Sequence, residues 1–413
     1  MALPEKNDVD ALVQKLAAAA DGYTSSPDLD GRIARLEIVD AAKKLIRSVS
    51  GPEMTPINHG MNVAELVAIR TFMKLKVLEA IPLEGGMSVQ DLSKATGAQE
   101  SLLERFARIL VATGFLDQER PDGGAYLHTK FSRAYLLSNP GPGHLFLAMY
   151  DAWLTSMVQF HEYLGAKGQL ENAREPDDAL YNPYTYSHKQ EGSSVWEIMS
   201  QDQEAFETFQ IGMAGMNHAI PVTGHFDFNS LKNTPEENKN GIIELIDVGG
   251  GHGSVLQEIL DNSPGLTPAN CMLQDRPEVI ALSKTGNTLN KDVQRLEHDF
   301  MTEEPIKGAK AYFMRMISHD YPDHTCIKIL KNLADAMSPE SRVLICDMVL
   351  PPRVTEIDFP AAVIDQAVMV MGGKERTQAG FQYLFDQAGL ELVKVWRVKG
   401  VPGACVEGRL KRA

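Results

Sequence analysis

The stretch that most constrains the fold lies in the middle of the chain, where an apolar segment runs into a cluster of glycines. Residues 242–248 read Ile-Ile-Glu-Leu-Ile-Asp-Val, residues 249–253 read Gly-Gly-Gly-His-Gly, and a helical pattern begins at Ser254. Glycine allows positive φ angles and a close approach of the backbone to a ligand. A strand, a glycine loop and a helix in this order place the loop at the carboxyl edge of a parallel sheet, where such sheets bind nucleotides and related ligands. The stretch therefore predicts an α/β sheet with a ligand site over this loop.

Short apolar segments alternate with helical patterns from residue 242 to residue 347. The segments with strand character are 242–248, 271–273, 293–296, 311–314 and 343–347, and the helical segments are 253–262, 278–284 and 324–337. Strands that alternate with helices are typical of a parallel sheet covered by helices. We therefore expect an α/β domain in the second half of the chain.

The glycine loop departs from the fingerprint of dinucleotide-binding proteins. That fingerprint, Gly-x-Gly-x-x-Gly, would need glycine at position 254, where this chain has serine. Asp275 follows the next predicted strand, where an acid can accept both ribose hydroxyls. Asp299 and Phe300 follow the third, where a carboxylate can accept an adenine amine and an aromatic ring can cover the base. Each acid alone also fits an exposed loop. The glycine loop, Asp275 and the Asp299–Phe300 pair, in this order, favour a nucleoside ligand without a pyrophosphate.

The first third of the chain reads as helical, with amphipathic segments at 11–20, 36–49 and 63–80. Ser88 and Ser101 each stand three residues before an acid, a spacing typical of helix N-caps. Two short helices followed by a hairpin-like stretch up to Thr129 predict a winged helix. Such a domain can bind DNA, but residues 88–116 hold three basic and three acidic side chains. This balance favours a packing or dimerisation role.

Composition excludes several classes of protein. The chain of 413 residues has 40 basic and 55 acidic side chains, a net charge of −15, which argues against general nucleic-acid binding. No apolar run reaches the ~18 residues of a membrane span, and the polar start of the chain does not resemble a signal peptide. The four cysteines stand far apart in sequence and fit neither a disulfide framework nor a zinc site. We therefore expect a cytoplasmic protein that binds neither membrane nor nucleic acid and has no metal site.

With these motifs in place, the chain resembles the plant-type class I O-methyltransferases that use S-adenosylmethionine, including their fungal secondary-metabolite branch. The resemblance covers roughly residues 60–410 and is strongest in six segments: 245–253, 273–280, 298–300, 315–323, 344–352 and 372–377. It implies an α/β, Rossmann-like methyltransferase domain preceded by a mainly helical winged-helix dimerisation domain, and a homodimer. The boundaries expected are 1–135 for the dimerisation domain, 136–193 for a helical linker that contributes to the substrate pocket, and 194–413 for the catalytic domain.

The resemblance also implies a set of cofactor-binding residues. Gly249, Gly250 and Gly251 would face the methionine part of S-adenosylmethionine. Asp275 would hold the ribose. The remaining members of the expected set are Arg276, Asp299, Phe300 and Arg315. Arg315 stands where plant members often have lysine, and arginine is bulkier and forked.

The segment Ile317-Ser-His-Asp-Tyr-Pro-Asp323 resembles the family's box around its general base. His319 matches the base, and Asp320 is its neighbour. Asp347 stands where plant members have a glutamate beside the histidine, and Glu375 matches the second flanking acid. A surface charge at Glu375 and a turn-capping role for Asp347 are the alternatives to these assignments.

The expected substrate contacts lie on two segments. Phe209, Met213 and Met216 match the helix that clamps the substrate in the family, and Val370 completes the set. The three residues on the helix stand at spacings of four and three, which also fit ordinary core packing.

Together these features predict methyl transfer from S-adenosylmethionine to a phenolic or enolic hydroxyl of a small aromatic or polyketide-type metabolite, with a histidine base and no metal. The alternative from another reaction class is an enzyme of the same fold that binds the cofactor without transferring its methyl group and steers a dehydration or a pericyclic reaction. A binding-only winged-helix protein is a third possibility, which the net charge disfavours.

Overall fold

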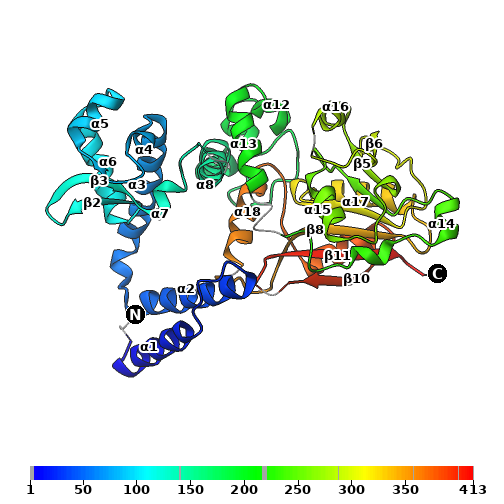
Figure 1. Ribbon diagram of the computed structural model, residues 1–413, viewed down its shortest axis with the longest axis horizontal. Helices are drawn as coiled ribbons and strands as arrows, with labels where there is room; N and C mark the ends of the chain where they lie inside the picture. The colour runs from blue at the N-terminus through cyan, green and yellow to red at the C-terminus, as the bar shows by residue number, and fades with distance from the viewer. Residues whose placement is uncertain are drawn as a thin grey trace. The chain divides into compact units, whose positions relative to one another are not determined.

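The computed structural model describes residues 4–138, 141–215, 221–286, 288–356, 358–398 and 400–412 (Figure 1). Contacts between residues divide the chain into two compact units. Unit 1 comprises Met1–Thr155 with Met199–Met216, and unit 2 comprises Ser156–Ile198 with Asn217–Ala413.

Unit 1 begins with helices α1 (Lys6–Asp21), α2 (Leu29–Val49), α3 (Thr55–Lys74) and α4 (Val77–Ala80). The first two contain the predicted helical segments. The predicted helix over 63–80 is wrong in one respect, because it breaks into α3 and α4. The break lies at Lys76, which adopts the left-handed conformation with φ of 54°, and an α-helix cannot continue through such a residue.

A winged helix follows, as the sequence predicts. It consists of β1 (Gly86–Met87), α5 (Val89–Thr96), α6 (Glu100–Ala112), β2 (Leu116–Arg120) and β3 (Gly123–His128), with the strands in the order β1-β3-β2. Ser88 caps α5 as predicted, accepting a hydrogen bond from the backbone N–H of Asp91. The second predicted cap is wrong. The N-cap of helix α6 is Gln99, two residues before the predicted position, so Ser101 lies inside the helix.

Short helices connect the winged helix to the sheet domain. They are α7 (Lys130–Arg133), α8 (Pro142–Leu147), a π-helical turn (Ala148–Leu154), α9 (Thr155–Val158), α10 (Phe160–Ala166), α11 (Pro183–Ser187), α12 (Val195–Met199) and α13 (Gln203–Gly215). Within unit 1, α13 packs closely on α8, where a Cβ atom on Gly212 would lie only 2.8 Å from the carbonyl oxygen of His144. This packing groups α13 with the N-terminal helices, whereas the expected boundaries place it in the catalytic segment 194–413.

Unit 2 is built on a twisted sheet with strands in the order β6-β5-β4-β7-β8-β11-β10 (Figure 1). The strands are β4 (Leu245–Val248), β5 (Cys271–Asp275), β6 (Gln294–Glu297), β7 (Ala311–Arg315), β8 (Arg342–Leu350), β10 (Leu390–Arg397) and β11 (Gly403–Leu410), with the short β9 (Arg376–Thr377) beside β8. β4 to β8 pair in parallel, and β11 runs antiparallel to both β8 and β10. The chain moves outward from β4 to β6 and then returns to the other side of β4, so the switch in strand order lies between β4 and β7. Ligands of open α/β sheets bind at the carboxyl end of such a switch.

Helices cover both faces of this sheet. The helices of unit 2 after residue 220 are α14 (Pro235–Lys239), α15 (Ser254–Asn262), α16 (Pro277–Thr285), α17 (Asp323–Ala334), α18 (Phe359–Met369) and α19 (Gln378–Gln387). One core joins the strands to α17 and α19, and a second joins them to α15 and α16. The parallel α/β sheet expected from the sequence is therefore present. None of the helices in the described ranges is long and apolar enough to cross a membrane.

A buried carboxylate fixes the entry to the central strand. Glu244, directly before β4, is fully buried and accepts two backbone hydrogen bonds at 2.7 Å, from the N–H of Asn233 and from the N–H of Thr267. These bonds tie two connecting loops to the first strand of the sheet.

Replacing Glu244 should therefore destabilise the domain. Glu244→Ala leaves the buried N–H of Asn233 and the part-buried N–H of Thr267 without an acceptor. An orphaned buried donor costs about 1–3 kcal/mol and a part-buried one costs less, so we expect the free energy of unfolding to fall by about 2–4 kcal/mol. Urea denaturation measures this loss. Glu340→Ala, at an exposed site, serves as the control and should lie within ~0.5 kcal/mol of wild type. A wild-type midpoint for Glu244→Ala would show that these bonds do not stabilise the sheet.

Candidate functional site

The glycine loop lies at the end of β4, on the carboxyl edge of the sheet. The backbone N–H groups of Gly249 and Gly250 donate to the carbonyl of Gln274 on β5, at 2.8 and 3.2 Å. A Cβ atom at position 250 would lie 2.3 Å from Asp247 Oδ2, and one at position 249 would lie 3.3 Å from the ring of Phe300. The loop therefore leaves room for the backbone alone, which keeps the space above it open to a ligand.

Two of the predicted nucleoside-binding residues lie against this loop. Asp275, at the end of β5, accepts a 2.7 Å hydrogen bond from the N–H of Gly251 through Oδ2. The ring of Phe300 packs edge-on to that of Tyr321, with the ring centroids 6.0 Å apart, and also lies beside Gly249. The structure thus brings together an acid, an aromatic ring and the glycine backbone, as the order of the motifs predicts.

The other two predicted residues are more exposed. Asp299 follows β6 and accepts a hydrogen bond from the N–H of Met301 at 2.9 Å, which caps its own turn. Arg276 follows Asp275, is exposed, and forms a 3.2 Å ion pair with Glu278. The guanidinium of Arg276 is therefore engaged at the surface.

Asp247 is a residue that the sequence argument did not single out. It is the last acid of β4, only 1% exposed, and lies directly below Gly250. Burial and the neighbouring charge of Asp275 raise the pKa of Asp247 to about 7, although the Arg315 guanidinium opposes the shift. A cation bound over the loop would favour the ionised form of this carboxyl. Its place in the strand directly before the glycines is the signal that could have identified it.

Arg315 ends β7 beside the same loop, and its side chain is largely buried. Burial lowers the pKa of Arg315, and the nearby charges of Cys346, Glu258, Asp347 and Asp247 oppose that shift. The predicted cofactor arginine therefore lies among acids at the switch point of the sheet.

His319 lies in a short 3-10 turn (Ser318–Asp320) after β7 and is buried. Its Nδ1 atom lies 2.8 Å from Glu375 Oε1, and its Nε2 atom lies 3.5 Å from Asp320 Oδ1. Burial by itself lowers the pKa of His319, but the charges of Asp320 and Glu375 and the hydrogen bond to Glu375 more than offset it and raise the pKa to about 10. The histidine is therefore protonated at neutral pH and held by two acids.

Asp347 is close to this pair but does not hydrogen-bond to the imidazole. It lies on β8, is buried, and accepts a 2.7 Å hydrogen bond from the N–H of Met316 and another from the hydroxyl of Ser318. Met316 adopts a positive φ of 52°, which is uncommon for a residue with a side chain. Asp347 therefore holds the strained loop that carries His319.

Arg376 was missed from the sequence, yet it organises the same loop. Its side chain is among the largest fully buried ones, and its guanidinium donates to the carbonyls of Ser318 at 2.7 Å and Tyr321 at 2.8 Å. Asp323 neutralises it through a bond of 2.9 Å from Nε. The arginine thus holds both ends of the turn that carries His319. Its position directly after Glu375 was the only signal, and nothing in the sequence shows that its side chain turns inward.

The segment before Arg376 approaches the histidine from the other side. The N–H of Lys374 donates to the carbonyl of His319 at 2.7 Å, and a Cβ atom on Gly373 would lie 2.2 Å from that oxygen. Glu375 is itself fixed by a 2.9 Å bond from its N–H to Asp365. Of the four predicted catalytic residues, His319 contacts both Asp320 and Glu375, and Asp347 holds the loop before the histidine.

The predicted substrate contacts fall in different parts of the structure. Val370, in unit 2, is fully buried after α18, and its carbonyl accepts a 2.9 Å bond from the N–H of Tyr184. Phe209, in unit 1, is buried with its ring edge-on to Trp153 at 5.7 Å, as expected of a core residue. Met213 is half-buried on the same helix, and Met216 lies outside the described residues.

Two family models match the chain. The O-methyltransferase domain matches residues 172–391, and the O-methyltransferase dimerisation domain matches residues 62–138. The O-methyltransferase hmp5 of Hypomyces subiculosus is 32% identical over 410 residues, covering 97% of each chain.

Solved structures share the fold. The crystal structure of OxaC in complex with sinefungin and meleagrin is 27% identical, with a TM-score of 0.81 over 99% of this chain and 100% of OxaC. A structure described as a pericyclic reaction enzyme is 22% identical, with a TM-score of 0.77 over 98% of this chain and 100% of the other, and shows a likeness of fold alone. The two matched domains and the curated relative show the family, and the glycine loop and the buried pair of His319 and Glu375 are consistent with it. The chain belongs to the S-adenosylmethionine-dependent O-methyltransferases.

Proposed function

We propose that this enzyme transfers the methyl group to a phenolic or enolic hydroxyl of a small aromatic or polyketide-type metabolite, with His319 as the general base. The observation that carries the proposal is the buried pair of His319 and Glu375, with Nδ1 and Oε1 2.8 Å apart. Because Nδ1 is engaged by the acid, Nε2 is the nitrogen available to a substrate.

The strength of this base matches the acceptor. A free imidazole titrates near ~6.5 and a phenol near ~10, so proton transfer between them would cost about 3.5 pKa units, or ~4.8 kcal/mol. In this site the pKa of His319 is raised to about 10, which removes most of that difference. A base whose pKa is close to that of the acceptor hydroxyl can take up the proton in the transition state at little cost in free energy.

The same acids set a condition on the reaction. His319 must lose its proton before it can accept one from the acceptor, because an imidazolium has no free lone pair. Asp320, 3.5 Å from Nε2, stabilises the protonated form. The account therefore requires that the rate increase with pH.

The residues around the glycine loop fit S-adenosylmethionine. Gly249, Gly250 and Gly251 give the backbone surface, Asp275 offers carboxylate oxygens to the ribose, and Phe300 offers a ring face to the adenine. Arg315, Asp299 and Arg276 complete the proposed set. When bound, the cofactor supplies an activated methyl group to the deprotonated oxygen.

Two buried side chains position the base in this proposal. Asp347 holds Met316 and Ser318 before the histidine, and Arg376 holds the carbonyls of Ser318 and Tyr321 on either side of it. Positioning of the reacting groups contributes several kcal/mol to enzymatic rates. Asp347 and Arg376 therefore act through His319 and not on the substrate.

The substrate contacts and the assembly remain part of the proposal. Phe209, Met213, Met216 and Val370 are the proposed substrate contacts. The match of residues 62–138 to a dimerisation domain supports a homodimer in which the winged helix contributes the interface. A cytoplasmic location stays a prediction.

Removal of the base should strongly reduce the rate of methyl transfer. We expect His319→Ala to lower kcat by about 10²–10⁴-fold, the usual contribution of a general base. The measurement is the formation of methylated product from a panel of phenols and enols. His324→Ala, an exposed histidine at the start of α17, is the matched control and should retain activity within about twofold. Normal turnover by His319→Ala would refute the assignment of the base.

Stoichiometry separates methyl transfer from the alternative. A methyltransferase forms one S-adenosylhomocysteine for each product, and the product is heavier by one methylene group. An enzyme that steers a dehydration or a pericyclic reaction would convert its substrate with no loss of S-adenosylmethionine, and that result would contradict the proposal.

The pH dependence should identify Glu375 as the acid that strengthens the base. We expect kcat/KM of the wild type to rise through and above pH 7, since the pKa of His319 is raised to about 10. In Glu375→Gln the loss of a negative charge lowers this pKa, so the rising limb moves to lower pH by at least about one unit. Titration of the acceptor is common to both enzymes and cancels in the comparison. The plateau of kcat/KM at high pH falls as well in Glu375→Gln, because the base is weaker. A rising limb at the same pH in both enzymes would contradict the role of Glu375 in strengthening His319.

A further inference from the structure

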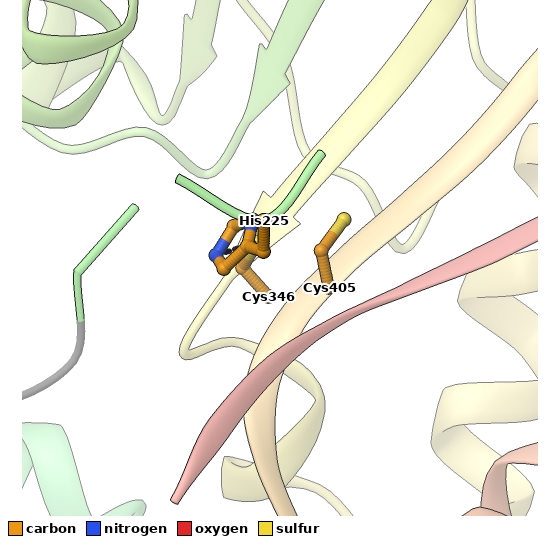
Figure 2. A group of neighbouring side chains, drawn as sticks. All are labelled: His225, Cys346 and Cys405. Atoms are coloured by element: carbon orange, nitrogen blue, oxygen red, sulfur yellow. Dashed lines mark hydrogen bonds between the residues drawn. The ribbon is translucent and has the colours of Figure 1, made fainter. Parts of the chain in front are cut away.

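Two of the four cysteines lie side by side in the sheet of unit 2, although they are 59 positions apart in sequence. Cys346 is on β8, Cys405 is on β11, and the imidazole of His225 lies beside Cys346 (Figure 2). The two sulfur atoms and an imidazole nitrogen all lie within 4.8 Å of one another. The wide sequence spacing of the four cysteines, all of which are free thiols in the structure, gave no sign of this proximity.

The register of the strands brings the two thiols as close as cross-strand neighbours can be. Cys405 lies directly opposite Cys346. The N–H of Val349 donates to the carbonyl of Pro402, which marks that pair as hydrogen-bonded, and alternation along the ladder makes 346 and 405 a non-hydrogen-bonded pair. The Cα atoms of such a pair lie about 4.5 Å apart, inside the range of about 4.4–6.8 Å that a disulfide requires. The register therefore places these residues at a separation that is compatible with a disulfide.

The Nε2 atom of His225 faces both the carbonyl of Pro221 and Cys346 Sγ. The Nδ1 atom of His225 accepts the backbone N–H of Phe226 at 2.9 Å, so the ring proton lies on Nε2. Nε2 lies 3.1 Å from the carbonyl of Pro221 and 3.9 Å from Cys346 Sγ. A metal bound at Nε2 would need the proton on Nδ1, where the N–H of Phe226 already points. The geometry therefore favours a stabilised thiolate over a metal ligand.

The surroundings distinguish Cys346 from the other cysteines. Burial by itself raises the pKa of the Cys346 thiol, but Cys405, His225 and the Arg315 guanidinium together lower it to about 6. Burial raises the pKa of both Cys271 and Cys326 to about 12. Thiolates react with oxidants and thiols do not, so these two buried cysteines are internal controls.

We propose that Cys346 and Cys405 are a redox-active dithiol that closes to a cross-strand disulfide when hydrogen peroxide oxidises Cys346. The Cys346 thiolate attacks one peroxide oxygen, the O–O bond breaks, and Cys346 becomes a sulfenic acid while hydroxide leaves and takes up a proton as water. The Cys405 thiol then displaces the sulfenic oxygen as a second water. The two thiols together lose two electrons and two protons to the peroxide.

A small oxidant suits this site better than a bulky disulfide. Both sulfur atoms are buried, with Cys405 at 0% exposure, but His225 lines a surface hollow of ≈ 280 Å³ with residues of the loop around Asp227. A molecule the size of peroxide fits such a hollow. The modified strand also carries Asp347, and the carbonyl of Cys346 accepts the N–H of Met316, so the dithiol adjoins the loop that holds His319.

Peptide mapping by mass spectrometry tests the proposal on the full-length enzyme. The protein is treated with hydrogen peroxide at pH 7, denatured, and alkylated. We expect a peptide pair that joins 346 to 405 with a loss of about 2 Da, reversed by dithiothreitol, while Cys271 and Cys326 remain alkylated. Cys405→Ser should stop at a sulfenic acid on Cys346 that dimedone traps. His225→Phe should slow the oxidation at least about threefold, because the thiolate loses its donor.

Three results would overturn the proposal. Equal oxidation of all four cysteines, or failure to link 346 to 405, would show that the pair has no special reactivity. Stoichiometric retention of Zn²⁺ after dialysis, with loss of alkylation at Cys346 and Cys405 only, would show a metal site instead.

Discussion

The buried ion pair of His319 and Glu375 is the interaction on which the rest of the site depends. A charged pair out of water is costly unless its geometry is good and its remaining polar atoms are satisfied. Here the imidazole nitrogen and Glu375 Oε1 lie 2.8 Å apart, and the peptide groups on either side are held by Lys374, Asp365 and Arg376, while Glu375 Oε2 is buried with no hydrogen-bond partner among the described residues. The surrounding hydrogen bonds thus maintain a strong base that a solvent-exposed histidine could not provide.

The acids of the site divide into two groups with different tasks. Asp275 and Asp347 accept backbone N–H bonds and shape the loops that carry the chemistry. Asp320 and Glu375 act most strongly on the imidazole, because their charges raise its pKa, and the charge of Asp347 adds a smaller effect in the same direction. Part of the net charge of −15 is therefore located where a cationic cofactor and a protonated histidine would both be stabilised.

Much of the fold and of the site could be predicted from the sequence, because both depend on local patterns. The glycine loop, the strand before it, the helix after it and the cap at Ser88 are such patterns, and the structure has them. The break at Lys76, the inward turn of Arg376 and the pairing of Cys346 with Cys405 are not local. Each follows from how distant segments pack, and hydrophobic periodicity carries no information about this. Asp247 is different, because its place in the strand just before the glycines is a local signal, and the structure shows its carboxylate below Gly250.

The proton affinity of His319 is the quantity that tests the central claim most directly. The ring resonances of ¹⁵N-labelled histidine can be followed by NMR between about pH 6 and pH 11, and the signal of His319 assigned by its absence in His319→Gln. The account predicts a midpoint well above the ordinary ~6.5 of a histidine, because Asp320 and Glu375 hold the protonated form. A midpoint at or below ~6.5 would show that burial outweighs both acids, and would contradict the matched-base mechanism.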